Sequence, residues 1–357
     1  MSEQSHLYYI AGIGMLTPVG FDTASTAAAV RAGMSVYEAS TNFIQEEQPI
    51  TMTRIPPEVF KIMDVHIDEC SYDKRIIKMA ILALREALGA QTIETPIPLL
   101  LAMPEAHEDV TCIEPEVLIK NLLEQKDLPL AANRVHCMMG GRAAGIQILV
   151  WANQYFTQHN ADYVLLGGSD SHWVYPRLGR LGEAGRLLAP ENMDGFAPGE
   201  GAGFILLTRH RQRAMVRDHH LVALSPAGSS QEPGHLHSDE PYRGDGLDHA
   251  FKQALDDYTG EPIRSIFSSM NGEHHWAKEY GVAYLRNKKY FHEKVNVEHP
   301  ADCYGDLGAA TGPVLIGLAA SDLLKRPDIA SHLVYSSSDG AARAAVRVEK
   351  LPLNTKI

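Results

Sequence analysis

The stretch Asp194–Gly203, which reads DGFAPGEGAG, decides the fold of this chain. Its closely spaced glycines suit a backbone that turns sharply or touches another backbone, because glycine adopts positive φ at low cost and has no side chain to collide. We therefore expect a backbone turn that includes Gly199, Gly201 and Gly203. The apolar run Gly203–Leu207 follows directly and is typical of a buried strand.

Three other segments belong with this stretch. Ala161–Gly168 (ADYVLLGG) indicates a strand that ends in glycines, and Tyr8–Gly20 (YYIAGIGMLTPVG) indicates a first strand followed by a turn. Near the other end of the chain, Gly308–Ala310 opens a helix of small residues. Together these blocks resemble the β-ketoacyl synthase branch of the thiolase superfamily, and the resemblance covers most of the chain in order.

The resemblance implies an α/β, thiolase-like fold, in which two similar βαβαβαββ halves pack in α/β/α/β/α layers. The alternation of strand and helix patterns also predicts a mostly parallel sheet covered by helices. We place the boundary between the halves so that they span residues 1–210 and 211–357. Expected strands are 8–13, 98–103, 162–167, 203–207, 221–224, 265–269, 333–336 and 344–349, and expected helices are 24–31, 74–88, 140–156, 247–258 and 308–324.

Two segments, 41–58 and 225–242, are rich in Pro, Gly, Ser, Glu and Gln, and we expect both to be surface loops. The first carries the acidic pair Glu46 and Glu47. A solvated loop and a contact with a partner are both compatible with this composition.

The composition is that of a globular protein with a large core, since 45% of the 357 residues are hydrophobic and 21% are charged. A net charge of -12 repels phosphate backbones and anionic lipids, so we expect neither nucleic-acid nor membrane partners. No apolar run approaches the ~20 residues of a membrane span, and no basic segment follows Met1. The expected location is the cytoplasm.

The chain has four cysteines: Cys70, Cys112, Cys137 and Cys303. They lack the CxxC spacing of zinc sites and disulfide scaffolds, and we interpret them as reduced thiols. Adjacent histidines such as His274 and His275 would point to opposite faces of a strand, whereas catalytic zinc needs ligands at a fixed spacing and a third donor. We therefore expect no metal and no cofactor.

In active members of the family that the chain resembles, the nucleophile is a cysteine at the start of a buried helix, where the dipole and backbone N–H groups lower its pKa. The corresponding helix here is 140–156, and the family's usual spacing to Asp162 places Arg142 at that position. Because Arg142 opposes the helix dipole, we expect a carboxylate or a bound anion beside it. The nearest thiol, Cys137, becomes the nucleophile only if the helix or its following loop is longer by more than a turn.

The resemblance also implies that both catalytic histidines are replaced. The first corresponds to Asn271, which cannot shuttle a proton near neutral pH. The second corresponds to Gly305, and we count its neighbour Asp306 among the altered positions. A lysine of the family becomes Pro300, and the phenylalanine loop that closes the acyl pocket becomes Ser338–Ala341.

A different catalytic set remains open: Cys137 or Cys303 as nucleophile, His274 or His275 as base, and Asp306 or Glu200 as the residue that orients the base. Such a protein would be a divergent 3-oxoacyl-ACP synthase or acyltransferase. The replacements at every family position favour a non-catalytic protein that acts by binding.

Two precedents in the superfamily fit a binding role. One is an inactive synthase subunit that pairs with an active partner, as chain-length factors do. The other is a thiolase-like accessory or chaperone-like protein found beside adaptors in bacterial type VI secretion clusters. Expected partners are a second copy of the chain, a related synthase subunit, a secretion adaptor or effector, or acyl carrier protein. We expect a dimer, because the strand before the nucleophile helix normally pairs across a two-fold axis in this fold.

Overall fold

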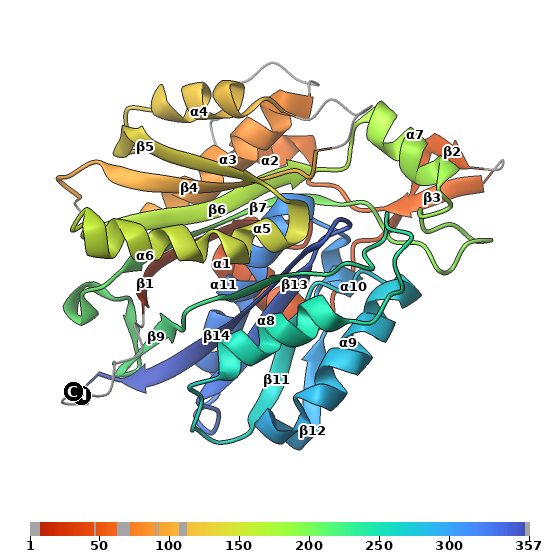
Figure 1. Cartoon of the computed structure of the whole chain (residues 1–357). Helices are drawn as coiled ribbons and strands as arrows, with labels where there is room; N and C mark the ends of the chain where they lie inside the picture. Colours follow the sequence, from red (N-terminus) through yellow and green to blue (C-terminus); the bar gives the residue numbers. More distant parts are fainter. Residues whose placement is uncertain are drawn as a thin grey trace.

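The computed structural model of the protein describes residues 8–45, 48–62, 72–89, 91, 93–106 and 113–353. Within these residues, twelve strands form one hydrogen-bonded sheet, and its main path runs in the order β12-β11-β13-β14-β9-β1-β7-β6-β4-β5. Figure 1 shows this sheet crossing the molecule with helices packed against it. The protein is therefore a mixed α/β structure, as the sequence predicts. The expected mostly parallel sheet is wrong, because four of the described strand pairs in this sheet are parallel and seven are antiparallel.

The sheet repeats one strand arrangement twice. Its first set is β1 (Tyr8–Leu16), β4 (Ile97–Met103), β5 (Leu130–Met139), β6 (Tyr163–Ser171) and β7 (Glu200–Thr208). Its second set is β9 (His220–Leu224), β11 (Ile263–Ser268), β12 (Phe291–Glu298), β13 (Ser331–Ser337) and β14 (Ala342–Pro352). In each set the third, second and fourth strands are parallel neighbours, and the fifth pairs antiparallel with both the fourth and the first.

This repetition confirms the two similar halves that the resemblance implies. The halves are joined where β1 pairs antiparallel with β9, at Tyr8 opposite Leu224. The boundary near residue 210 remains a prediction.

Helices fill three layers around and between the halves. The outer helices of the first half are α3 (Tyr72–Leu88) and α4 (Pro115–Leu123), and those of the second half are α8 (Asp245–Leu255) and α9 (His274–Arg286). The central layer holds α5 (Gly141–Gln147), α6 (Leu149–Gln158) and α11 (Thr311–Leu323). The central helices share one apolar cluster with strands of both halves, so the start of α5 lies deep inside the molecule.

Shorter elements complete the chain. The helices are α1 (Thr23–Arg31), α2 (Pro57–Ile62), α7 (Tyr175–Glu183), α10 (Ala301–Tyr304) and the 3-10 turns η1 (Arg211–Arg213), η2 (Lys288–Tyr290) and η3 (Gly308–Ala310). The strands are β2 (Glu38–Gln45), β3 (Gln48–Met52), β8 (Val216–Arg217) and β10 (Gly228–Gln231).

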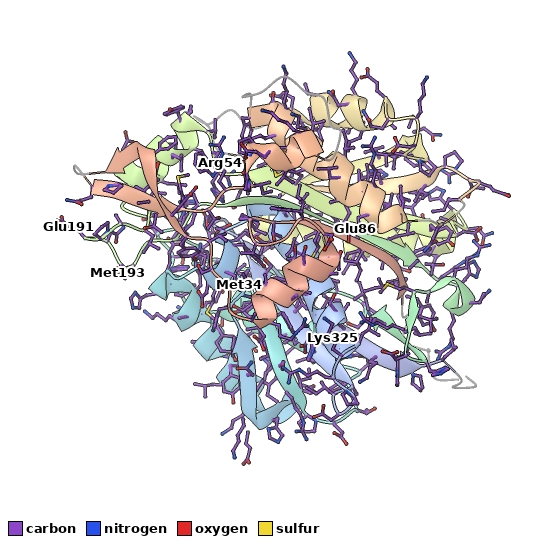
Figure 2. The ribbon with its side chains drawn as sticks, turned by 180° about the vertical axis from the view of Figure 1, so that it is seen from behind. Met34, Arg54, Glu86, Glu191, Met193 and Lys325 are labelled. Atoms are coloured by element: carbon purple, nitrogen blue, oxygen red, sulfur yellow. The ribbon has the colours of Figure 1, made fainter. Side chains whose placement is uncertain are left out.

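Glu86, labelled in Figure 2, ties α3 to the first strand and to α1. Its carboxylate accepts hydrogen bonds from the N–H of Met15 at 2.9 Å and from the N–H of Thr23 at 2.8 Å. The second bond satisfies an N–H at the start of α1 that has no partner within the helix. A single side chain of α3 thus positions both the strand and the helix that follows it.

The turn expected at Gly199, Gly201 and Gly203 is wrong for two of these residues. Strand β7 begins at Glu200, so Gly201 and Gly203 lie inside the strand. A side chain at Gly201 would come within 2.8 Å of the Leu16 carbonyl oxygen, and one at Gly203 within 2.9 Å of the Val314 backbone nitrogen. These glycines therefore allow β7 to pack closely against β1 and α11 rather than to turn.

The loop expected over 41–58 is also wrong, because β2 and β3 form an antiparallel hairpin across this segment and α2 begins at Pro57. Glu46 and Glu47 lie outside the described residues. The segment 225–242 does follow the surface as a loop for most of its length, but it contributes β10, which pairs with β14. No helix among the described residues is long and apolar enough to cross a lipid bilayer.

Candidate functional site

Arg142 is the second residue of α5 and is 6% exposed. Its guanidinium donates to Asp306 Oδ2 at 2.6 Å, to Asp339 Oδ1 at 2.7 Å and to the Ser337 carbonyl oxygen at 2.8 Å. The ring of Trp276 covers the guanidinium, with its centroid 4.5 Å from the Arg142 Cζ. Two carboxylates therefore lie beside Arg142, where one was expected. Their negative charges balance a positive charge that lies at the positive end of a helix.

Asp306 is the acceptor at the centre of the site. Its Oδ2 also accepts from Asn271 Nδ2 at 2.9 Å, and its Oδ1 accepts from the Gly308 N–H at 2.8 Å and lies 3.3 Å from His172 Nε2. The preceding Gly305 has φ 76°, and a side chain there would lie 2.6 Å from the Ala197 carbonyl oxygen. Gly305 is thus required by the backbone path that delivers Asp306 to the site.

Asn271 brings the segment after β11 into the same network. Its Nδ2 lies 3.1 Å from Glu273 Oε2 as well as contacting Asp306. Glu273 in turn accepts two hydrogen bonds from Arg186, at 2.7 and 2.8 Å, and one from Trp276 Nε1 at 2.9 Å. The positions of Arg142, Asn271 and Asp306, which are far apart in the sequence, therefore meet in one hydrogen-bonded cluster.

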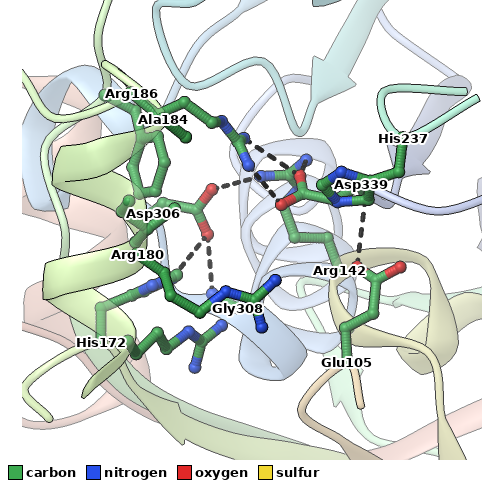
Figure 3. A pocket seen from close by; sticks show the side chains of 14 residues that line it. Glu105, Arg142, His172, Arg180, Ala184, Arg186, His237, Asp306, Gly308 and Asp339 are labelled. Carbon is green, nitrogen blue, oxygen red and sulfur yellow. Dashed lines mark hydrogen bonds and ion pairs between the residues drawn. The ribbon is translucent and has the colours of Figure 1, made fainter. Parts of the chain in front are cut away.

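The loop Ser338–Ala341 closes the cluster from the second half. Asp339 accepts from Arg186 at 2.6 Å in addition to Arg142. Ser338 Oγ accepts the Ala143 N–H at 2.9 Å, so an amide at the start of α5 is already bonded. Glu105, just after β4, accepts from the N–H groups of Asp339 and Gly340 at 3.2 and 2.6 Å. We call Arg142, Arg186, Glu273, Asp306 and Asp339 the arginine–carboxylate network, and Figure 3 labels all of these residues except Glu273.

The charges of this network fix its protonation. Burial raises the pKa of Asp306, but the Arg142 charge and the His172 hydrogen bond outweigh it and hold that pKa well below its usual value. Burial alone would likewise raise the pKa of Asp339, yet the two arginines hold it low. Burial lowers the pKa of His172, and the nearby Arg177 charge adds to this effect, so the imidazole is neutral at pH 7. Asp306 and Asp339 are therefore ionised at neutral pH and form full ion pairs with Arg142 and Arg186.

A small pocket adjoins the network, with a volume of about 80 Å³. Figure 3 shows side chains from α5, α7 and the loops that carry Asp306 and Asp339 converging on it. Its walls include four arginines, two histidines and three acids: Arg142, Arg177, Arg180, Arg186, His172, His237, Glu105, Asp306 and Asp339. Pockets for drug-sized ligands hold about 300–1,000 Å³, so this one has room only for a small group or a few waters.

Cys137 lies in β5, five residues before Arg142, and not at the start of a helix. It packs with the apolar cluster of α3 and α4, whereas its neighbour Met138 packs on the opposite face, toward α5. Burial raises the pKa of the Cys137 thiol to about 11, and the Glu116 charge contributes. The thiol therefore lacks both the helix-start amides and the lowered pKa of an activated nucleophile.

The alternative catalytic set is spread over separate contacts. His274 is paired with Asp194 at 2.5 Å, and His275 stacks on Tyr242 with ring centroids 4.2 Å apart. Cys303 is buried in α10, where burial and then the Asp302 charge raise its pKa. Glu200 forms an ion pair with Arg75. Among the described residues, no hydrogen bond joins a cysteine to a histidine, and Cys70 and Cys112 lie outside those residues.

Sequence reasoning missed several residues of the site, namely Glu105, His172, Arg180 and Arg186. Three of them lie on or beside α7, which was not predicted because its nine residues include two glycines. A usable signal was present, since Arg177 and Arg180 are three residues apart and share one side of a helix.

No family model and no curated protein matches this chain. Solved structures do match it. The ishigamide ketosynthase/chain length factor is 18% identical, with a TM-score of 0.74, over 97% of this chain and 99% of that one. A ketosynthase in complex with its chain length factor from Xenorhabdus doucetiae is 14% identical, with a TM-score of 0.67, over 98% and 99%. A β-ketoacyl synthase from Burkholderia phymatum is 13% identical, with a TM-score of 0.69, over 98% and 100%.

These similarities define the fold as thiolase-like along nearly the whole chain. Within that class, the neighbours are ketosynthases and chain length factors, so the chain is β-ketoacyl synthase-like in structure. The resemblance read from DGFAPGEGAG is thereby confirmed.

Proposed function

We propose that this protein is a non-catalytic β-ketoacyl synthase-like subunit that acts by binding another protein. The observation that carries the proposal is the buried Arg142 at the start of α5, ion-paired with Asp306 and Asp339. By the resemblance, this is the position of the nucleophile. A guanidinium that is permanently charged and fully hydrogen-bonded has no lone pair with which to attack a thioester.

The surrounding groups support the same proposal. Asn271 and Asp306 are bonded to each other and to arginines or Glu273, and neither can serve as a neutral proton-transferring base. The Ala143 N–H, which lies where an oxyanion hole would need a free donor, is bonded to Ser338. The pocket is too small for an acyl chain on its carrier arm.

A surface for a partner is available at β5. This strand is an end of the sheet and pairs with β4 alone among the described strands. Met139 of β5 is 42% exposed and Val150 of the adjacent α6 is 48% exposed. An unpaired edge next to exposed apolar side chains favours pairing with another chain. Two of the similar structures are named as ketosynthases with a chain length factor, which supports a synthase-type partner.

The enzymatic half of the proposal is tested by decarboxylation and condensation assays with malonyl-carrier protein and an acyl primer. Wild type and Cys137→Ala should both remain at background, measured by mass spectrometry of the carrier-bound products. Turnover by wild type near one per second that is lost in Cys137→Ala would replace the proposal with the divergent-synthase alternative.

The binding half is tested by affinity purification from the native host, with a Met139→Asp/Val150→Asp variant as the comparison. A synthase-type subunit captured by wild type and lost with the variant supports a role like that of a chain-length factor. A secretion adaptor captured in the same way would support the accessory role instead. Equal capture by wild type and variant would contradict binding through β5.

A further inference from the structure

Arg180 is the one lining arginine of the pocket that has no carboxylate partner among the described residues. It extends from α7 into the pocket (Figure 3). Its Nη1 is buried and has no hydrogen-bond partner within the part of the chain that the structure describes. A buried donor left without an acceptor costs about 1–3 kcal/mol, and more when it is charged.

The other three arginines are committed to acids. Arg142 pairs with Asp306 and Asp339, and Arg186 pairs with Asp339 and Glu273. Arg177 donates to Asp170 Oδ1 at 2.9 Å. Arg180 is therefore the lining arginine whose positive charge has no carboxylate partner among the described residues.

The carboxylate acceptors of the pocket are also occupied. Both oxygens of Asp306 accept two contacts each, from Arg142 and Asn271 on one side and from His172 and Gly308 on the other. Both oxygens of Asp339 accept from arginines. The Glu105 carboxylate accepts from the backbone of the 338–341 loop. Two polar atoms of the pocket walls lack a partner among the described residues: Arg180 Nη1, a donor, and His172 Nδ1, which is an acceptor in the neutral ring that donates through Nε2. The uncompensated charge belongs to the Arg180 donor, and a charged donor selects a ligand that accepts.

The pocket volume selects the size of that ligand. About 80 Å³ admits a carboxylate or a phosphate group and excludes a long chain. Phe196, Leu181 and Ala184 form an apolar part of the wall, which would keep water away from a bound oxyanion and strengthen its hydrogen bonds.

We propose that the pocket binds a small oxyanion, a carboxylate or a phosphate group, on the Arg180 guanidinium. This inference deepens the proposed function and rests on it, because the pocket is taken as a binding site that no longer performs chemistry. The ligand would leave the arginine–carboxylate network intact.

The test is isothermal titration calorimetry of the full-length protein with acetate and, separately, with inorganic phosphate. Wild type should bind at least one of the two with 1:1 stoichiometry. Arg180→Gln should weaken that binding by roughly 10-fold or more, as expected for the loss of a charged hydrogen bond. Arg85→Gln, which removes an exposed arginine paired with Asp127, is the matched control and should bind like wild type.

A second variant keeps Arg180 in place. Ala184 lines the pocket and lies one helical turn after Arg180, so Ala184→Glu places a carboxylate within reach of the guanidinium. This variant should also lose oxyanion binding while it unfolds at the same temperature as wild type or higher.

Binding by acetate alone assigns a carboxylate ligand, and binding by phosphate alone assigns a phosphate group. No saturable binding by wild type, or unchanged affinity in Arg180→Gln, overturns the inference. The condensation assay on the same wild-type preparation separates this failure from that of the proposed function. An inactive protein without an oxyanion site would leave the proposed function standing, whereas an active one would remove it.

Discussion

Arg142 affects the site in two ways. It excludes a nucleophile from the start of α5, and it provides the countercharge for two buried carboxylates. Removing one partner of a buried ion pair is more costly than exchanging both, because the remaining charge keeps its desolvation penalty. Under the proposed function, the residue that replaces the nucleophile therefore also stabilises the fold.

We predict that Arg142→Met destabilises the protein by about 3–5 kcal/mol in urea unfolding, because Asp306 and Asp339 lose their shared countercharge. Adding Asp306→Asn should recover part of that loss, since the two sites are in direct contact and are not additive. Arg85→Ala, which breaks an exposed pair, should cost about 1 kcal/mol or less. Equal losses for Arg142→Met and Arg85→Ala would contradict a structural role for the network.

The thiol of Cys137 should react slowly. With a pKa raised to about 11, only a small fraction is thiolate at pH 8, roughly one part in a thousand. Iodoacetamide should therefore label Cys137 more slowly than it labels a free thiol such as N-acetylcysteine, as measured by peptide mapping. Fast stoichiometric labelling at this cysteine would mean that the thiol is activated and would support the divergent-synthase alternative.

His275 predicts a pH dependence of stability. Burial, with the Arg343 charge second, lowers its pKa to about 4, and its Nε2 is buried without a hydrogen-bond partner among the described residues. The unfolded chain then binds more protons than the folded one between pH 6.5 and 4, so stability falls as the pH is lowered through this window. Urea unfolding of His275→Phe should show a smaller fall than wild type.

A variant of the exposed His249, His249→Gln, is the control for this measurement and should retain the wild-type slope. An identical slope in His275→Phe and wild type would show that His275 does not contribute.

Two glycines, each inside a secondary structure element, predict opposite effects of the same substitution. Gly203 lies in β7, where a Cβ would be 2.8 Å from Val314 Cγ2, so Gly203→Ala should cost about 1–3 kcal/mol by overpacking against α11. Gly179 lies in the middle of α7, and a Cβ there meets no atom within 4 Å, so Gly179→Ala should stabilise by about 0.5–1 kcal/mol. Thermal unfolding of both variants checks the pair, and a stabilised Gly203→Ala would contradict the close packing of β7.

The sequence identifies buried elements best. β1 and β4 are continuous apolar runs, and β6 and β7 each contain a shorter one, as expected for strands that are covered on both faces. The end strands β5 and β12 were missed because they carry polar residues, as strands with an open edge do. The β2–β3 hairpin was missed because its polar composition is typical of a loop, whereas its two strands are stabilised by pairing with each other.

Some residues of the site were likewise predictable from the sequence, and others were not. Arg142, Asn271 and Asp306 were found because the resemblance supplies their spacing, and the structure brings them together. Arg186 and Glu105 had no such guide, since each reaches the site from a loop whose path depends on tertiary packing. Local pattern carries no information on which loops converge.

At the scale of the whole molecule, the open edge of β5 predicts self-association or pairing with a related subunit. Light scattering at micromolar concentration should give twice the monomer mass for the isolated chain. Met139→Asp and Val150→Asp should each shift it toward monomer, because a charge would be buried in an apolar interface. Leu285→Asp, at a side chain of α9 that is 68% exposed, should leave the mass unchanged.

A monomer for wild type alone, together with a stable complex formed with a co-expressed synthase subunit, would select the heterodimer. A monomer under both conditions would contradict the use of β5 as an interface.

The positive and negative residues of the arginine–carboxylate network come from different parts of the chain. Both of its cations, Arg142 and Arg186, come before residue 210, and all three of its anions, Glu273, Asp306 and Asp339, come after it. Each ion pair therefore fastens one half of the duplicated fold to the other. Expressed separately, each half would have to solvate network charges of a single sign that it normally buries, so the two segments should be soluble and ordered only when they are produced together.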